Sequence, residues 1–135
     1  MFCRLIAGEL PAARVFEDAH TLAFMDLGQV NPGHVLVVHK RHAPTLLELT
    51  ADEAAAMMRT AHRVGQAVAA AFAPPGLMLL QCNGKAAEQT VGHVHLHLVP
   101  RHADDGVALT WPRKEPARPI LEDYARRLRE ALSCG

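Results

Sequence analysis

Three histidines alternate with apolar residues in the last third of the chain. His93, His95 and His97 stand in the stretch HVHLHLVPR, which runs from residue 93 to residue 101. Successive side chains of a β-strand point to opposite faces, so the three imidazoles share one face and the apolar residues between them share the other. The pattern predicts a strand with one face for burial and one face for chemistry.

Alternating histidines allow three interpretations. The strand could simply be half exposed and rich in histidine, although strict alternation opposite apolar residues speaks against this. Two imidazoles at His-x-His spacing could bind one metal ion, since neutral imidazole is a common ligand. Alternatively, one imidazole could attack phosphorus as a nucleophile, with a neighbour fixing its tautomer and other histidines donating to the phosphoryl oxygens.

The loop before the histidines favours phosphate chemistry over metal binding. Its sequence, NGKAAEQTVG at residues 83–92, has small residues whose backbone amides can approach an anion. Gln89 and Thr90 add neutral donors suited to phosphate oxygens or to a leaving group. A loop rich in carboxylates would instead have favoured a metal ion.

The patterning of the chain predicts the elements that position these residues. A long helix is expected over residues 50–72, because Thr50 and Glu53 form a capping-box pair before a run of good helix formers, and PPG ends it. A second, amphipathic helix is expected over residues 118–132, after a proline-rich linker. Four apolar runs predict strands at residues 21–26, 34–39, 77–82 and 93–100.

Length, charge and cysteine content narrow the class of protein. A chain of 135 residues fits one domain, and its 14 basic and 14 acidic residues give no basic field for binding nucleic acid. Three widely spaced cysteines suit a reducing compartment, so the cytoplasm is the expected location. No stretch approaches the ~20 apolar residues of a membrane span, and neither membrane insertion nor secretion is expected.

Taken together, these motifs resemble the histidine triad (HIT) family, in its nucleotide-binding, phosphoramidase-like branch. The family signature is His-φ-His-φ-His-φ-φ, where φ is apolar, and residues 93–99 match it completely. The likeness extends over about residues 2–101, through FCRLIAGELPA and NPGHVLVVHKRH.

The resemblance implies an α+β, HIT-like fold with an antiparallel sheet, one long helix and a C-terminal helix. Residues 1–101 would form the HIT domain. Residues 102–135 lie outside the resemblance, and their patterning predicts a C-terminal extension whose amphipathic helix packs on the same domain. The resemblance further implies a homodimer whose two sheets join across the interface.

Catalytic roles for five residues follow from the resemblance. His95 would be the nucleophile and form a covalent nucleotidyl-histidine that water hydrolyses. The carbonyl of His93 would accept from the other ring nitrogen of His95, and His97 would contact the phosphate oxygens. His34 would join this network from the neighbouring strand, and Thr90 would help the leaving group.

The resemblance also implies a nucleotide-binding set: Asp26, Leu27, Asn83, Gly84, Gln89 and Thr90. Asp26 would accept from the ribose hydroxyls and Leu27 would cover the base, while Asn83 and Gly84 would belong to the phosphate loop. A carboxylate on a sugar diol and neutral donors on a phosphate suit a mononucleotide. The resemblance implies a purine nucleotide of the AMP or GMP type as the substrate.

Many bacterial members of the family hold zinc with two N-terminal cysteines, the histidine that ends KRH and the first triad histidine. This chain offers Cys3, His42 and His93 for such a site. A closed structural zinc site uses four protein ligands, so three predict a degenerate site that is lost or weakened. No cofactor is expected to be required for the attack itself. His20, His39, His62 and His102 match no motif and are interpreted as surface or satisfied core histidines.

The predicted function is cleavage of a phosphoramidate or phosphoanhydride bond at the α-phosphate of a purine nucleotide. Two alternatives stay open. The protein could be a dinucleoside polyphosphate hydrolase of the same family, a branch that HLVPRH resembles, whereas FCRLIAGELPA resembles the phosphoramidase branch. It could also be a regulatory module that binds a nucleotide or a metal ion without turning it over.

Overall fold

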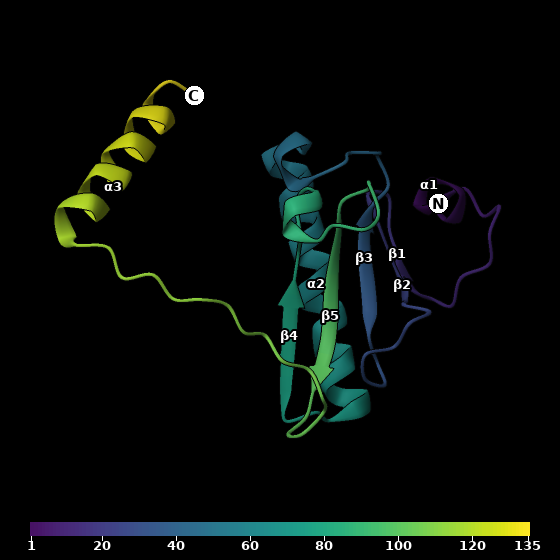
Figure 1. Ribbon diagram of the computed structural model, residues 1–135. Coiled ribbons are helices and arrows are strands. Elements are labelled where there is room, and N and C mark those ends of the chain that lie inside the picture. Colours follow the sequence, from purple (N-terminus) through teal and green to yellow (C-terminus); the bar gives the residue numbers. More distant parts are fainter.

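A five-stranded, wholly antiparallel sheet forms the centre of the computed structural model, which describes residues 1–135 (Figure 1). The strand order is β1-β2-β3-β5-β4, with β4 at one edge. The strands are β1 (Arg14–Glu17), β2 (Thr21–Met25), β3 (Val35–His39), β4 (Gly76–Leu80) and β5 (His95–Arg101). The helices are α1 (Phe2–Ile6), α2 (Ala51–Phe72) and α3 (Arg118–Ser133). Short 3₁₀ turns lie at Leu46–Glu48 and Lys85–Ala87.

Helix α2 begins at the predicted capping box. The Thr50 hydroxyl accepts from the backbone N–H of Glu53 at 3.2 Å, and the Glu53 carboxylate accepts from the N–H of Thr50 at 2.8 Å. Both orphan donors of the first turn are thereby satisfied. Ala73, in the left-handed conformation with φ 46°, ends the helix before the two prolines. The prediction of the long helix is confirmed.

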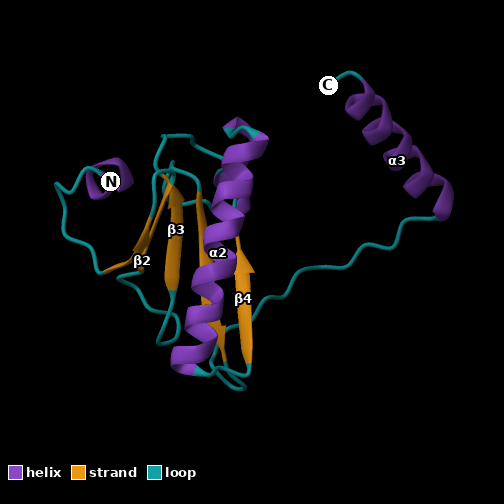
Figure 2. Ribbon diagram, turned by 180° about the vertical axis from the view of Figure 1, so that it is seen from behind, coloured by secondary structure: helices purple, strands orange, loops and turns teal.

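Each face of the sheet buries its own apolar cluster. The face covered by α2 holds the larger cluster, which includes Val94, Leu96 and Leu98 from between the histidines (Figure 2). The opposite face packs Phe2 and Leu5 of α1 against β2 and β3. The predicted division of the histidine strand into a buried apolar face and a histidine face is confirmed.

Two short elements of the structure were not predicted from the sequence. Strand β1 has only four residues, most of them exposed, and α1 has only five. Neither is long enough to show a periodic pattern, and each is stabilised by contacts with the rest of the sheet domain. Strand β5 begins at His95, so His93 lies in the turn just before it.

Helix α3 does not pack on the sheet domain. None of its residues is buried, and both ribbon views place it at the end of an extended segment, beyond the β4 edge (Figures 1 and 2). The prediction that this helix packs on the same domain is therefore wrong for the single chain. An amphipathic pattern indicates that one face will be covered, but it does not identify the covering surface. No helix of the protein combines the length and the hydropathy that crossing a bilayer would need.

Candidate active site

The middle histidine of the triad is held in one tautomer by its own strand. Nδ1 of His95 lies 2.7 Å from the backbone carbonyl of His93. Since a carbonyl can only accept, Nδ1 carries the hydrogen and the lone pair is at Nε2. The ring is buried, with 7% of the residue exposed. The structure thus presents the arrangement that a nucleophilic imidazole needs, with the attacking nitrogen unprotonated.

The third triad histidine is oriented by a chain of hydrogen bonds from the loop before β3. The N–H of Val30 donates to Nδ1 of His34 at 3.3 Å, so the hydrogen of His34 is at Nε2. This Nε2 lies 2.9 Å from Nδ1 of His97 and donates to it. The remaining N–H of His97 is therefore at its Nε2, where it is available as a donor.

Asp26 completes this group from the end of β2. Its Oδ1 accepts from the N–H of Gly28 at 2.9 Å, and its Oδ2 lies 3.4 Å from Nε2 of His34. Asp26, His34 and His97 also have the composition of a metal site. However, Nε2 of His34 carries a hydrogen, which it donates to His97, and has no free lone pair for a metal ion. We call this arrangement the relay: the hydrogen-bonded pair of His34 and His97, with the Asp26 carboxylate beside it.

Burial keeps three histidines around His95 uncharged. Desolvation is the main cause that lowers the pKa of His34, His93 and His97, and for His97 the pKa falls to about 4. Nearby His95 and His34 lower the pKa of His97 further, while Asp26 opposes the shift. At neutral pH these imidazoles are therefore neutral, as the hydrogen-bond pattern requires.

Acid should destabilise the protein through His97. Its pKa is about 4 in the folded chain against an ordinary value of 6.5, so protons bind preferentially to the unfolded chain between these values. We expect the free energy of unfolding to fall by up to about 3 kcal/mol from this group as the pH drops from 7 to 4. Urea titrations at several pH values measure this, and a His97→Gln variant should lose less stability than the wild type. An equal loss in both proteins would contradict the assignment.

A cavity of about 280 Å³ lies between α1 and the histidine face of the sheet. Five of the predicted site residues line it: Asp26, Leu27, Thr90, His95 and His97. Its remaining lining is mostly apolar and includes Phe2, whose ring centroid lies 5.3 Å from that of His95. Helix α1, which the sequence did not predict, therefore forms one wall of the cavity. His34 and His93 lie behind the lining, against the residues that they orient.

The other predicted nucleotide-binding residues organise the loop and do not line the cavity. Gln89 accepts from the N–H of Gly84 at 2.7 Å and donates to the carbonyls of Pro44 and Val91 at 2.6 and 2.9 Å. Both of its N–H groups are thereby used, which gives Gln89 a positioning role in this structure. The Asn83 side chain is likewise engaged within the loops.

Gln29 is a positioning residue that the sequence did not reveal. Its Oε1 accepts from the N–H groups of Gly33 and His34 at 3.0 and 2.9 Å. Its Nε2 donates to the carbonyls of Asp26 and His34. One amide side chain therefore fixes the loop that carries the acid and the histidine of the relay. A glutamine in a turn gives no periodic signal from which this could be predicted.

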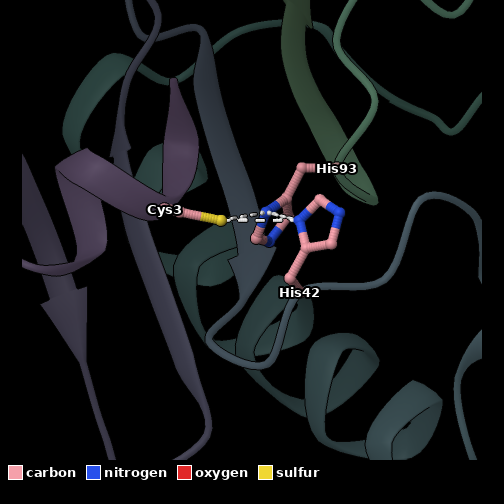
Figure 3. A group of neighbouring side chains, drawn as sticks. All are labelled: Cys3, His42 and His93. Carbon is pink, nitrogen blue, oxygen red and sulfur yellow. Dashed lines mark hydrogen bonds between the residues drawn. The ribbon is translucent and has the colours of Figure 1, made fainter.

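The three predicted metal ligands converge on one point (Figure 3). Sγ of Cys3 lies 3.4 Å from Nδ1 of His42 and 3.6 Å from Nδ1 of His93, and the two nitrogens are 3.2 Å apart. Nε2 of His93 donates to the carbonyl of His39 at 2.7 Å, which leaves Nδ1 with its lone pair. Zn–N and Zn–S bonds of about 2.0–2.3 Å give tetrahedral edges of about 3.3–3.7 Å, so the three residues fit a zinc ion.

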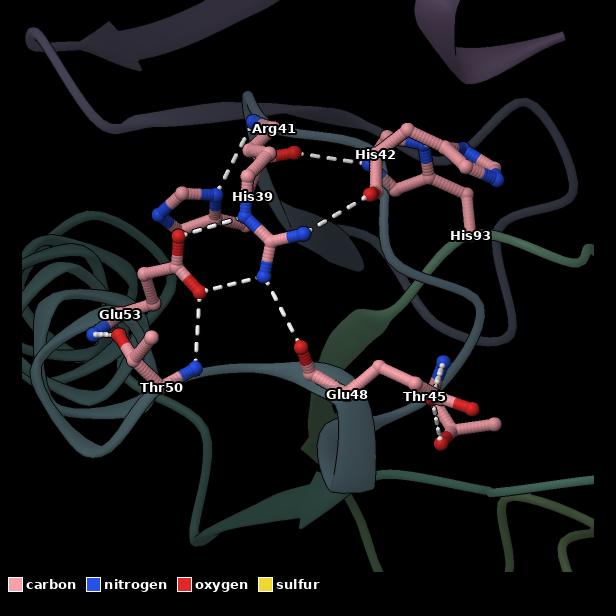
Figure 4. Close-up of polar contacts among 8 residues, drawn as sticks. All are labelled: His39, Arg41, His42, Thr45, Glu48, Thr50, Glu53 and His93. Carbon is pink, nitrogen blue, oxygen red and sulfur yellow. Dashed lines mark hydrogen bonds and ion pairs between the residues drawn. The ribbon is translucent and has the colours of Figure 1, made fainter.

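Arg41 anchors the loop that carries His42 (Figure 4). Its guanidinium makes two contacts of 2.6 Å with the carboxylate of Glu53 and donates to the carbonyl of Glu48. The hydrogen bonds from the Arg41 guanidinium lower the pKa of Glu53 to about 2. The Arg41 N–H also donates to Nδ1 of His39, whose buried Nε2 has no partner. His39 is thus a core histidine that is only partly satisfied, and its carbonyl orients His93.

Comparison with known proteins gives a consistent result. The HIT domain matches residues 7–104 of the chain. "Protein hit" of Bacillus subtilis is 37% identical over 135 residues, covering 95% of this chain and 93% of the relative. "Adenosine 5'-monophosphoramidase hnt1" of Schizosaccharomyces pombe is 32% identical, covering 98% and 95%. "Adenylylsulfatase HINT3" of Arabidopsis thaliana is 35% identical, covering 78% and 53%.

Solved structures agree with these matches. A HIT family protein from Bacillus subtilis superposes with a TM-score of 0.92 at 34% identity, covering 96% of this chain and 94% of the other. A HIT family protein from Bacillus anthracis gives 0.93 at 36% identity, covering 97% and 95%. A Zn-bound histidine triad family protein from Mycobacterium smegmatis gives 0.75 at 32% identity, covering 96% and 95%.

Proposed function

The chain belongs to the HIT domain family, and on this basis we propose that it hydrolyses a phosphoramidate or phosphoanhydride bond at the α-phosphate of a purine nucleotide. The observation that carries the proposal is the tautomer of His95, whose Nδ1–H is held by the His93 carbonyl within a cavity lined by further donors. Relatives named as an adenosine 5'-monophosphoramidase and an adenylylsulfatase support cleavage at an adenylyl group.

The proposed reaction has two displacements. In the first, the lone pair of His95 Nε2 attacks the α-phosphorus, a P–N bond forms, and the bond to the leaving amine or second nucleotide breaks. The N–H of His97 is proposed to donate to a phosphoryl oxygen, and Thr90, which lines the same cavity, to assist the leaving group as it takes a proton from solvent. In the second, water attacks phosphorus and the P–N bond to His95 breaks, which releases the nucleoside monophosphate and restores His95. The proton that this water gives to solvent balances the proton that the leaving group took from solvent in the first step.

Asp26 and Leu27 are proposed to hold the nucleoside in the same cavity. One Asp26 oxygen is fixed by Gly28, which leaves the carboxylate oriented to accept from ribose hydroxyls. Leu27 is fully exposed, although it lines the cavity. An apolar side chain in this position gains burial when a base covers it.

Shortening Leu27 should therefore weaken binding and spare the fold. We expect Leu27→Ala to raise the KM for an adenosine phosphoramidate about 5- to 30-fold, because about 1–2 kcal/mol of apolar burial is lost. The free energy of unfolding should stay within about 0.5 kcal/mol of wild type, since the side chain is exposed in the free protein. Steady-state kinetics and urea denaturation measure both. An unchanged KM would remove Leu27 from the binding surface.

We propose that the attack on phosphorus needs no metal ion, because protein N–H groups supply the donors to the phosphate. A zinc ion held by Cys3, His42 and His93 would be structural: it would fix α1 and the His93 ring. Three protein ligands instead of four would make such a site weaker than a closed one.

The proposed assembly is a homodimer in which two sheets join at their β4 edges. Strand β4 has no neighbour on one side, and Leu77, Leu79 and Leu80 are each more than a third exposed. Unpaired edges of this kind are templates for pairing with a second chain.

The proposed location is the cytoplasm, because all three cysteines are free. Because the protein has a formal net charge of zero, we do not propose nucleic acid as a partner.

Turnover of defined nucleotides separates this function from simple binding. The protein is mixed with adenosine 5'-phosphoramidate, or with a dinucleoside polyphosphate, and AMP release is followed by chromatography. Release from the phosphoramidate supports the proposal, and faster release from the dinucleotide selects the other hydrolase branch. Binding of AMP without release from either substrate would replace the enzyme with a nucleotide-binding module.

A further inference from the structure

The C-terminal helix carries an apolar stripe that nothing covers. Five large residues of α3 form it, each 45% or more exposed: Ile120, Leu121, Tyr124, Leu128 and Leu132. On the opposite face, Arg126 pairs with Asp123 at 2.6 Å and with Glu130 at 2.8 Å. Isolated helices of this length are marginal in water, so the stripe requires an apolar partner surface to hold the helix.

The chain leaves its own domain at a defined point. Arg101 donates to the Asp105 carboxylate at 2.7 Å and to the carbonyl of Val107 at 3.2 Å, which ties residues 102–107 to the end of β5. The Asn31 side chain adds a bond of 3.0 Å to Asp105. From Ala108 to Ala117 the segment contains Pro112 and Pro116 and buries no residue. Prolines keep such a segment extended and hinder its folding back on the domain.

The departing segment runs past the β4 edge. Both ribbon views show residues 108–135, here called the arm, extending beyond β4 on the side away from β5 (Figures 1 and 2). This edge carries the exposed leucines of β4, and the half-exposed Met58 of α2 lies beside Leu77 and Leu79. A second copy that pairs at this edge would occupy the space into which the arm extends.

Two relatives of known structure share the position of the arm. The TM-scores of 0.92 and 0.93 against the two Bacillus proteins extend over 96% and 97% of this chain. The arm is about a fifth of the chain, so a different placement would limit the score to about 0.8 even with a perfect match elsewhere. Two crystallised relatives therefore hold this helix away from their own domains as well.

We propose that two copies of this chain exchange their arms, so that α3 of each copy packs its apolar stripe on the domain of the other. The inference rests on the proposed homodimer and adds the surface and the segment that stabilise it. We propose a second copy of the chain as the partner that covers the stripe, because pairing at β4 places that copy directly in the path of the arm. By two-fold symmetry the same contact then forms twice.

Photocrosslinking of the full-length protein tests the exchange. The photoreactive residue benzoylphenylalanine replaces Leu128 in the stripe or, as a matched control, Glu130 on the charged face. For each variant, ¹⁵N-labelled and unlabelled protein are mixed, irradiated and analysed by mass spectrometry, so that crosslinks between two chains can be told from crosslinks within one. We expect crosslinks between two chains from position 128, at least tenfold more than from position 130.

The outcomes separate this inference from the homodimer on which it rests. A crosslink from position 128 to the same chain's own domain would overturn the exchange. Absence of any crosslink in a protein that sediments as a dimer would overturn the exchange and leave the homodimer standing, whereas a monomer would overturn both. As a second measurement, Leu128→Glu should raise the dimer dissociation constant at least tenfold, and Glu130→Gln should leave it unchanged.

Discussion

Replacing His95 with alanine or glycine should reduce AMP release from adenosine 5'-phosphoramidate by about 10⁴- to 10⁶-fold, because both variants remove the attacking nitrogen. The substitution leaves Asp26 and Leu27 in place, so AMP should still bind with a dissociation constant within about tenfold of wild type. Single-turnover assays measure the rate, and calorimetry measures the binding.

Two controls make this result specific. His102→Ala removes an exposed imidazole that has no site contact and should leave the rate unchanged. Adding a chelator should change neither the wild-type rate nor the loss in the variants, since the attack is proposed to need no metal ion. Survival of more than about 1% of the wild-type rate in His95→Ala would show that another group attacks phosphorus.

Gly33→Ala should destabilise the protein by about 2–4 kcal/mol and impair turnover at the same time. Gly33 has φ +101°, which side chains other than glycine rarely adopt, and an added Cβ would lie 2.9 Å from the Phe72 ring and 3.1 Å from Cγ of Pro100. Its N–H also donates to Gln29, which holds the loop of His34. Urea denaturation measures the stability, and kcat reports the displacement of the relay.

Gly92→Ala is the matched control for this effect. Gly92 does not have a positive φ, and nothing lies within 4 Å of an added Cβ. Its free energy of unfolding should therefore change by less than about 0.5 kcal/mol. If Gly33→Ala changed the free energy of unfolding as little as Gly92→Ala, this would contradict the close approach of α2 and β5 to the turn at Gly33.

The sequence predicted those parts of the fold that repeat a local pattern. Alternation around His95 identified the strand and its two faces, and Thr50 with Glu53 marked the start of α2. Helix α1 and strand β1 were missed because each is too short to show a period. Their positions depend on contacts with residues distant in sequence, such as the 5.5 Å approach of the Phe2 and Phe24 rings.

The residues of the candidate site likewise divide into those that the sequence predicted and those that it did not. Residues in the triad motif or at strand ends, such as His95 and Asp26, come together in the cavity as the family resemblance implies. The supporting contacts of Gln29 and of the His39 carbonyl could not be predicted, because a hydrogen-bond partner across a loop leaves no mark in residue spacing. For the same reason, the sequence did not show that the Gln89 amide donates to backbone carbonyls of the loops.

The central claim is that His95 forms a covalent nucleotidyl intermediate, and the stereochemistry at phosphorus tests it most directly. A substrate with a chiral α-phosphorothioate is hydrolysed in ¹⁸O-labelled water, and the configuration of the product is determined by ³¹P NMR. Two successive in-line displacements, first by His95 and then by water, predict overall retention of configuration. Inversion would mean that water attacks phosphorus directly, and it would contradict the role assigned to His95.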